Sequence, residues 1–168
     1  MKALIVTADQ FEDSELFVPK KALENAGFEV EIATPEKGHQ FRGKHGGTVI
    51  ADLTLREVDT EQYDLLLLPG GKAPEQLRHD EHAREIAKRF FSSNKPVAAI
   101  CHGPQILLSA RLLEGRHATC HKSVAQQLTD GGALYEDSEV VVDGNLITAR
   151  EPGDLPAFLR EILKLLRG

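Results

Sequence analysis

Four consecutive leucines at residues 65–68 are the feature that most constrains the fold of this chain. They end at Pro69-Gly70-Gly71, so the apolar run is too short for a helix. A strand that is apolar on both sides is typical of a sheet covered on both faces. Further apolar runs at 2–7 and 96–100 alternate with helical patterns, such as the apolar stripe of residues 81–91. The alternation predicts an α/β fold: a doubly wound, mostly parallel sheet with helices on both faces.

The other elements follow from local signals along the chain. Residues 13–26 predict a helix that ends at Gly27, and Pro19 is expected to kink or split it. Residues 36–47 predict a loop or small hairpin, and residues 117–121 a strand. A hairpin is expected around residues 143–145, followed by a last helix from 154. With 168 residues and no linker or repeat, the sequence predicts one domain over 1–168.

Charge and cysteine content exclude several classes of protein. Twenty basic and 26 acidic residues give a formal net charge of -6, which offers no general attraction to nucleic acid or to anionic lipid. The apolar opening is too short for a signal peptide or a membrane span. Only two cysteines are present, which favours a reducing compartment over a disulfide framework. We therefore expect a cytoplasmic protein.

The most informative motif is Ala99-Ile100-Cys101-His102-Gly103-Pro104. An apolar strand meets a helix start here with almost no loop, and a cysteine occupies the corner. Such a nucleophile elbow strains the corner residue and requires small neighbours two positions away, as Ala99 and Gly103 are. The helix N-terminus is expected to favour the thiolate of Cys101. A plain buried cysteine is the alternative, but it requires neither the small residues nor the proline.

Two further motifs are expected at the same edge of the sheet. Backbone N–H groups of Gly70 and Gly71, with that of His102, would form an oxyanion hole, unless the glycines form a plain turn. Glu12 follows the first strand and could reach the thiolate, where a carboxyl group is expected to keep its proton. A favourable interaction with a helix N-terminus is an equal alternative for Glu12.

Together these residues resemble the PfpI intracellular-protease family, within the superfamily that includes the Parkinson-associated protein deglycase. The resemblance covers essentially the whole chain. It depends on four motifs: Phe11-Glu12-Asp13, Leu68-Pro69-Gly70-Gly71, the cysteine motif, and a tail from Val141-Val142-Asp143-Gly144-Asn145 through Asp154-Leu155-Pro156.

The resemblance implies a flavodoxin-like fold with Cys101 as nucleophile and His102 as its base. It also implies that Glu12 hydrogen-bonds to the sulfur and that Gly71 and His102 supply the oxyanion donors. Glu75 matches a family glutamate that orients the histidine from an adjacent subunit. A homo-oligomer, a dimer or a trimer of dimers, is then expected. The substrates implied are small carbonyl compounds, glycated amines or peptides.

One segment departs from the family pattern. Relatives carry Ser-Tyr-Pro where this chain has Cys120-His121-Lys122, so His121 replaces an aromatic hydroxyl near the expected pocket. Cys120 would face the same edge as Cys101, which allows the two sulfurs to pair on oxidation. Simple packing of Cys120 is the alternative.

The favoured function is a stress-protective cysteine enzyme of the glyoxalase, deglycase or intracellular peptidase type. A non-catalytic redox sensor or stress chaperone that uses an oxidisable Cys101 is the alternative. A glutamine amidotransferase is rejected because no histidine follows His121. The sequence has no phosphate-binding or dinucleotide motif and no metal-ligand spacing, so neither cofactor nor metal is expected.

Overall fold

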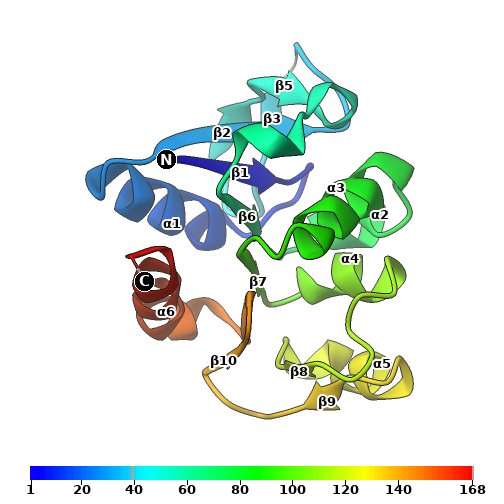
Figure 1. Ribbon diagram of the computed structural model, residues 1–168. Coiled ribbons are helices and arrows are strands. Elements are labelled where there is room, and N and C mark those ends of the chain that lie inside the picture. The colour runs from blue at the N-terminus through cyan, green and yellow to red at the C-terminus, as the bar shows by residue number, and fades with distance from the viewer. Residues whose placement is uncertain (39, 168) are drawn as a thin grey trace.

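The computed structural model describes residues 1–38 and 40–167 as a central sheet between two layers of helices (Figure 1). The seven strands of this sheet have the spatial order β10-β11-β7-β6-β1-β2-β5. All neighbours are parallel except the β10–β11 pair. In chain order the strands are β1 (Lys2–Val6), β2 (Glu29–Thr34), β5 (Leu53–Thr54), β6 (Leu65–Leu68), β7 (Val97–Ile100), β10 (Val140–Asp143) and β11 (Leu146–Ala149).

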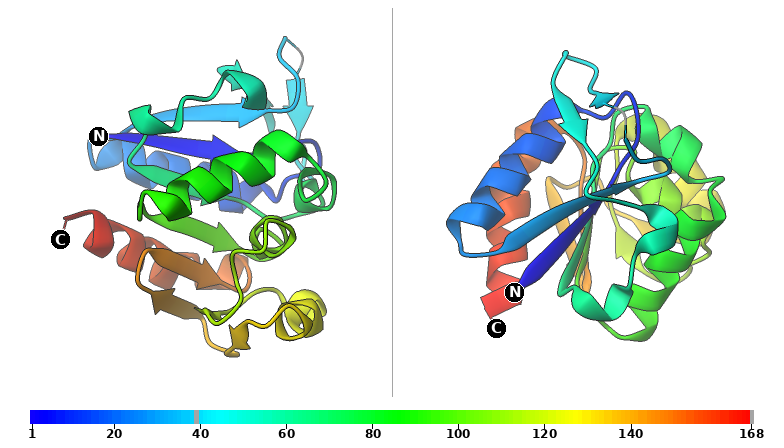
Figure 2. Two further views of the ribbon diagram at one scale, coloured as in Figure 1. Left: turned by 45° about the vertical axis from the view of Figure 1, so that its right-hand side comes forward. Right: turned by 90° about the horizontal axis from the view of Figure 1, so that it is seen from above.

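Helices cover both faces of the sheet, as Figure 2 shows from above. One layer holds α1 (Asp13–Asn25) and α6 (Leu155–Arg167). The opposite layer holds α2 (Ala73–Leu77), α3 (Glu81–Ser92), α4 (Pro104–Ser109) and α5 (Ala125–Asp130). Short 3-10 helices, η1 (Leu55–Glu57), η2 (Thr60–Gln62), η3 (Lys122–Val124) and η4 (Pro152–Asp154), join these elements. The flavodoxin-like α/β architecture expected from the sequence is confirmed.

The hydrophobic core lies on both sides of β6 and its neighbours. All four leucines of β6 are buried, and β7 is buried along its whole length. Strands β6 and β7 carry no polar side chain, and their burial on both faces explains why their sequences do not alternate. Parallel strands β1, β6 and β7 end at the same edge of the sheet, and the loops that follow them meet there.

Two expectations about local structure are corrected in part. Pro19 does not split the first helix, because Asp13–Asn25 is one continuous element, and a kink at Pro19 stays a prediction. The strand expected over residues 117–121 is shorter: β8 (His117–Ala118) pairs only with β9 (Leu134–Tyr135). Beyond Ala118 the backbone leaves the ladder, because the N–H of Thr119 donates to the Thr148 hydroxyl.

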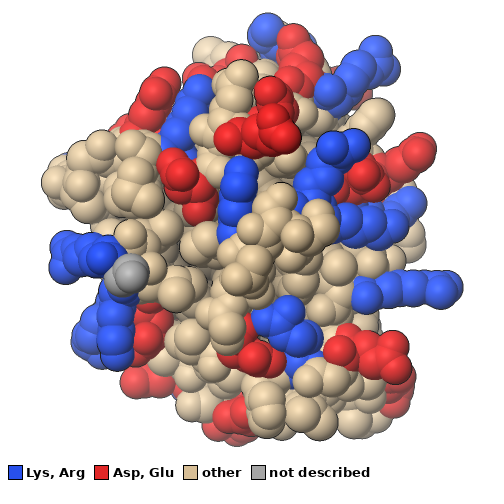
Figure 3. All heavy atoms as spheres, in the orientation of Figure 1, with Lys and Arg blue, Asp and Glu red and all other residues tan. Residues whose placement is uncertain are grey.

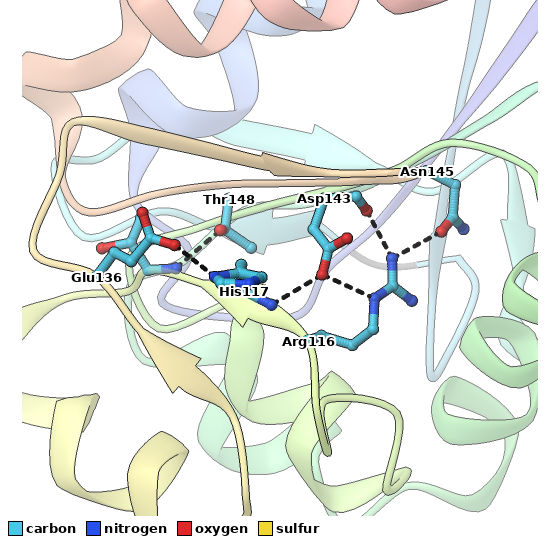
Figure 4. Close-up of polar contacts among 7 residues, drawn as sticks. Arg116, His117, Glu136, Asp143, Asn145 and Thr148 are labelled. Atoms are coloured by element: carbon cyan, nitrogen blue, oxygen red, sulfur yellow. Dashed lines mark hydrogen bonds and ion pairs between the residues drawn. The ribbon is translucent and has the colours of Figure 1, made fainter.

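A polar network holds β8 against the β10–β11 hairpin (Figure 4). Arg116 Nε donates to Asp143 Oδ2 at 3.2 Å, and the same oxygen accepts from the backbone N–H of His117 at 2.8 Å. Thr119 N lies 2.9 Å from Thr148 Oγ1 on β11. These bonds set the path of the chain after β8. They therefore place residues 119–123 beside the edge of the sheet at which β7 ends.

A second small hairpin, β3 (Gln40–Arg42) with β4 (Thr48–Ile50), lies over the start of α1. It confirms the hairpin alternative for residues 36–47, though its strands extend to Ile50. On the face drawn in Figure 3, basic and acidic side chains are intermixed. No helix among the described residues has both the length and the apolar character that crossing a bilayer requires.

Candidate active site

Cys101 occupies the turn between β7 and α4. Its φ is +65°, a left-handed conformation that a non-glycine residue adopts only at a cost of about 1–2 kcal/mol. Neighbouring backbone holds the corner from both sides: Cys101 N donates to Ala149 O at 3.0 Å, and Cys101 O accepts from His121 N at 2.9 Å. The strained elbow expected from the sequence is therefore present and is fixed by its surroundings.

Glycine is required on two sides of this corner. A Cβ on Gly103 would lie 2.3 Å from the backbone oxygen of Leu68 on the adjacent strand. A Cβ on Gly70 would lie 2.6 Å from both Cys101 Cβ and Glu15 Oε1. The structure thus confirms that the position two residues after Cys101, occupied by Gly103, requires a small residue. Gly70, which follows β6, is required for the same steric reason.

Backbone donors converge on the sulfur, which belongs to a residue only 7% exposed. The N–H groups of Gly71 and His102 both hydrogen-bond to Cys101. The expectation for Gly70 is wrong: its N–H donates to Glu15 Oε1 at 2.8 Å and is not free to bind a substrate oxygen. Gly71 and His102 therefore supply the two donors at this position.

The carboxyl group beside the sulfur belongs to Glu15, which corrects the expectation for Glu12. Glu15 is fully buried and its side chain interacts with that of Cys101. Glu12 has an extended backbone just before α1, and its Oε2 lies 3.0 Å from His45 Nε2. A side chain one turn inside a helix points back toward the helix start, and this direction carries Glu15 to the corner.

A signal for Glu15 was present in the sequence. Glu15, Pro19 and Leu23 are spaced four residues apart and are all buried on one face of α1. A carboxyl group in the apolar stripe of a helix is unusual, because burying an unpaired charge is costly. Such a glutamate is a candidate functional residue on spacing alone.

Burial controls the protonation of the two buried groups. It raises the pKa of Glu15 to about 8, against the opposing effect of the Gly70 N–H, so the carboxyl is mostly neutral at pH 7. Burial, followed by the Glu15 charge, raises the pKa of Cys101 to about 12, although the N–H groups of Gly71 and His102 oppose this. Burial thus opposes the thiolate and the two N–H groups favour it, and the resting thiolate of Cys101 stays a prediction.

His102 is placed to act as a base beside Cys101. Its Nδ1 lies 3.1 Å from Cys101 Sγ. Burial lowers the pKa of His102, and the neighbouring His121 and Lys44 lower it further, while Glu75 raises it. A neutral imidazole is the form that accepts a proton from the thiol. The assignment of His102 beside the nucleophile is thus supported by geometry.

The predicted pocket residue His121 packs directly on His102. The two rings are stacked, with centroids 4.9 Å apart and planes 20° from parallel. Ser123, which the sequence analysis missed, bridges them: its Oγ lies 3.1 Å from His102 Nε2 and 2.7 Å from His121 Nδ1. No local pattern marks Ser123, because only the path of the chain after β8 brings it to the histidine.

Two other expected residues lie near the site without a settled role. Glu75 is exposed in the first turn of α2, and its charge acts on His102 within the same chain. Its proposed action across a subunit interface stays a prediction. Cys101 and Cys120 are both buried, and neither forms a disulfide. Their pairing on oxidation also stays a prediction.

The tip of the β3–β4 hairpin forms one border of this region. Asp13 accepts hydrogen bonds from His45 N at 2.9 Å and from Gly47 N at 2.8 Å. These bonds fasten the tip to the start of α1, where Glu12 pairs with His45. Lys44, in the same tip, is close enough to act electrostatically on both His102 and Glu15.

Fold and site together define a class: an open α/β sheet that presents a cysteine nucleophile, with a histidine beside it, at a strand-to-helix turn. Comparison with known proteins agrees with this class. The chain belongs to the DJ-1/PfpI family, whose model matches residues 1–165.

Individual relatives cover nearly the whole chain. "Deglycase PfpI" of Pyrococcus furiosus is 50% identical over 167 residues, which are 99% of this chain and 100% of the relative. "Putative cysteine protease YraA" of Bacillus subtilis is 46% identical over 166 residues, 99% of this chain and 98% of the relative. The crystal structure of a ThiJ/PfpI domain protein from Brachyspira murdochii superposes with a TM-score of 0.94 at 31% identity, covering 99% of this chain and 96% of that one.

Proposed function

We propose that this protein is a cysteine-dependent enzyme that acts on small reactive carbonyl compounds, with Cys101 as the nucleophile. The observation that carries the proposal is the set of groups at one sulfur: two backbone N–H donors, a neutral carboxyl group and a neutral histidine. The name deglycase, carried by a relative 50% identical over the whole chain, supports the same chemistry.

The first step is addition of the thiol to an aldehyde. Cys101 passes its proton to His102 while the sulfur forms a bond to the carbonyl carbon, and the π electrons move to the carbonyl oxygen. The N–H groups of Gly71 and His102, which meet at the sulfur, are placed to stabilise this oxygen. Return of the proton to the oxygen gives a hemithioacetal.

For methylglyoxal the remaining steps need only water. The proton on the hemithioacetal carbon moves to the neighbouring carbonyl carbon, and the hydroxyl proton moves to the oxygen of that carbonyl, which gives a thioester of lactate. Water then hydrolyses the thioester and regenerates the Cys101 thiol. The sum is methylglyoxal plus water to lactate, with no external oxidant or reductant. His102 is the group beside the sulfur that can move these protons.

Peptide hydrolysis is a second candidate, because the name of the Bacillus subtilis relative is that of a cysteine protease. The same sulfur, histidine and N–H donors would serve acyl transfer. Only 7% of Cys101 is exposed, which favours a small substrate over a peptide chain.

The test compares lactate formation from methylglyoxal by the native protein, Cys101→Ala and Cys120→Ser. We expect Cys101→Ala to lose essentially all activity and Cys120→Ser, the matched control at the other buried thiol, to keep it. Equal rates for native protein and Cys101→Ala would refute the proposal. A fluorogenic peptide assayed with the same proteins distinguishes the peptidase alternative.

We also propose that the protein is a homo-oligomer in which Glu75 of an adjacent subunit approaches His102. The exposure of Glu75 on α2 and the family membership support this proposal. Analytical ultracentrifugation of the native protein is the measurement, and a monomer at micromolar concentration would contradict it.

A further inference from the structure

A charged cavity, the outer cavity, lies beside the nucleophile, next to the residues that follow β8. Its volume is about 260 Å³. It is lined by His121, Lys122, Asp137, Arg150 and Glu151. His121 joins the outer cavity to the active site, because its ring stacks on that of His102 with centroids 4.9 Å apart. His102 Nδ1 in turn lies 3.1 Å from Cys101 Sγ, so one wall of the cavity is also a wall of the active site.

An ion pair holds one side of the outer cavity in place. Arg150 Nε and Nη2 donate to the two carboxylate oxygens of Asp154 at 2.9 and 3.1 Å, and Asp154 is only 5% exposed. Arg150 Nη1 also donates to Asp137 Oδ1 at 3.1 Å. A pair joined by two parallel bonds fixes the orientation of both side chains. The guanidinium of Arg150 is therefore already satisfied, and its role is to shape the cavity.

Two other charged side chains line the outer cavity, those of Lys122 and Glu151. Neither of them forms a hydrogen bond or an ion pair with any other described residue. They come from different segments, because Lys122 begins η3 and Glu151 precedes η4. Within the described chain the cavity thus offers one unpaired cation and one unpaired anion. A ligand with a positive and a negative charge close together matches both, whereas a simple anion or cation leaves one of them unmatched.

The cation of the outer cavity lies in the segment where this chain departs from its relatives. Lys122 occupies the place of the proline in their Ser-Tyr-Pro, and His121 occupies the place of the tyrosine. A proline has no charge and no N–H group, so it cannot pair with an anionic group. The charge pattern of this cavity is therefore not shared by relatives that carry the proline.

A free amino acid matches the size and the charges of the outer cavity. Its α-ammonium and α-carboxylate groups are attached to one carbon. The cavity of about 260 Å³ lies just below the range of about 300–1,000 Å³ for drug-sized ligands, so it suits a ligand of few atoms. The four-carbon stem of a lysine spans about 6 Å, at roughly 1.2 Å for each bond of an extended chain. This length exceeds the 4.9 Å between the stacked rings of His121 and His102, so the side-chain nitrogen can extend from the cavity toward Cys101.

We propose that the outer cavity binds the α-ammonium and α-carboxylate groups of a free amino acid whose side-chain amine carries a methylglyoxal adduct. Lys122 pairs with the carboxylate, Glu151 pairs with the ammonium group, and the adduct lies at Cys101. The proposal rests on the proposed function and names its substrate class. In a protein both α groups are consumed by peptide bonds, so a glycated lysine within a chain lacks both charges. The 7% exposure of Cys101 agrees with a small substrate.

The adduct enters the reaction proposed above at the hemithioacetal. In the adduct, the amine nitrogen is bonded to a carbon that also carries a hydroxyl group. The Cys101 sulfur forms a bond to this carbon, the carbon–nitrogen bond breaks, and a proton passes through His102 to the nitrogen. The sum is thiol plus adduct to hemithioacetal plus free amino acid. The hemithioacetal then leads to lactate with one water, and no oxidant or reductant is needed.

Titration calorimetry tests the outer cavity with a mimic that does not react at the sulfur. Nε-acetyl-L-lysine carries both α charges and has a neutral amide in place of the adduct. Nε-acetyl-L-lysinamide lacks the carboxylate, and Nα,Nε-diacetyl-L-lysine lacks the ammonium group. Native protein should bind the first compound about fivefold to tenfold more tightly than either of the others, the range for one partly exposed charged pair. Equal binding of the three compounds, or no binding of the first, would overturn the proposal.

Two variants assign the charges. Lys122→Met should weaken binding of Nε-acetyl-L-lysine about fivefold or more and leave Nε-acetyl-L-lysinamide unaffected, because that compound has no carboxylate to lose. Glu151→Gln should show the same pattern with Nα,Nε-diacetyl-L-lysine as the unaffected compound. Lys122→Arg keeps the charge and should bind the mimic within about threefold of native protein. Lys88→Met, at an exposed position of α3, is the control and should bind as native protein does. Equal weakening of all three compounds by Lys122→Met would contradict its pairing with the carboxylate.

Protection of Cys101 shows whether the bound mimic extends to the nucleophile. At about ten times its Kd, Nε-acetyl-L-lysine should slow alkylation of Cys101 by iodoacetamide about tenfold, in proportion to the sites left empty. Mass spectrometry of the Cys101 peptide follows the rate. Glycine, which has both α charges and no side chain, should not protect. Unchanged alkylation with the mimic bound would overturn the proposal. Absence of lactate formation from methylglyoxal by native protein would refute the proposed carbonyl chemistry, whereas calorimetry and protection decide the outer cavity in either case.

Discussion

Replacing Glu15 by glutamine should change the stability of the protein in a pH-dependent way, increasingly in favour of the variant as the pH rises from 5 to 8. Burial raises the pKa of this carboxyl from its ordinary 4.5 to about 8. The unfolded chain releases the Glu15 proton near pH 4.5, whereas the folded protein keeps it until about pH 8. Stability is therefore lost as pH rises from 4.5 to 8 and then levels off. Glutamine does not ionise and escapes this loss.

The magnitude follows from the two values. At 1.36 kcal/mol for each pH unit, the full loss approaches 5 kcal/mol, and between pH 5 and pH 8 it amounts to about 3–4 kcal/mol. The new amide places an N–H₂ group where Oε2 has no partner among the described residues. Burying that donor costs about 1–3 kcal/mol, but this cost is the same at every pH. The change with pH is therefore the diagnostic quantity.

Urea unfolding of native protein and Glu15→Gln at pH 5, 6, 7 and 8 measures this quantity. The stability difference should move in favour of the glutamine variant by about 3 kcal/mol or more over that range. Glu139→Gln is the matched control, because Glu139 is exposed and loses little hydration on folding. A difference for Glu15→Gln that stays constant from pH 5 to pH 8 would show that the buried carboxyl is ionised throughout, and the protonation argument would fail.

Two substitutions test how the corner and the hairpin are held. Gly103→Ala would place a Cβ 2.3 Å from a backbone oxygen of β6, so we expect a loss of about 3 kcal/mol or more in thermal unfolding. Gly153→Ala is the control, because its Cβ would meet nothing within 4 Å, and it should change stability by less than about 1 kcal/mol. Equal losses of stability in Gly103→Ala and Gly153→Ala would contradict the steric argument. Asp13→Ala removes the acceptor for His45 and Gly47, so it should cost about 1–3 kcal/mol and speed proteolysis within the β3–β4 hairpin. Native resistance of that variant to limited proteolysis would show that other contacts hold the hairpin.

Much of the scaffold could be predicted from short stretches of sequence. Residues 65–68 predicted a buried central strand because a strand covered on both faces tolerates no polar side chain. Residues 143–145 predicted a hairpin, which the structure forms between β10 and β11. The corner at Cys101 was predictable because a strand without a loop before its helix requires the small residue found at Gly103.

The sequence by itself thus determined the layers, the elbow and the identity of the nucleophile, because strand periodicity and close backbone approach act over a few residues. Only the tertiary structure decided which groups surround the sulfur. It placed Glu15 there instead of Glu12, and it brought Ser123 to His102 through hydrogen bonds around β8. It also buried Cys101 among elements distant in the sequence, and this burial opposes the effect of the local helix terminus on the thiol.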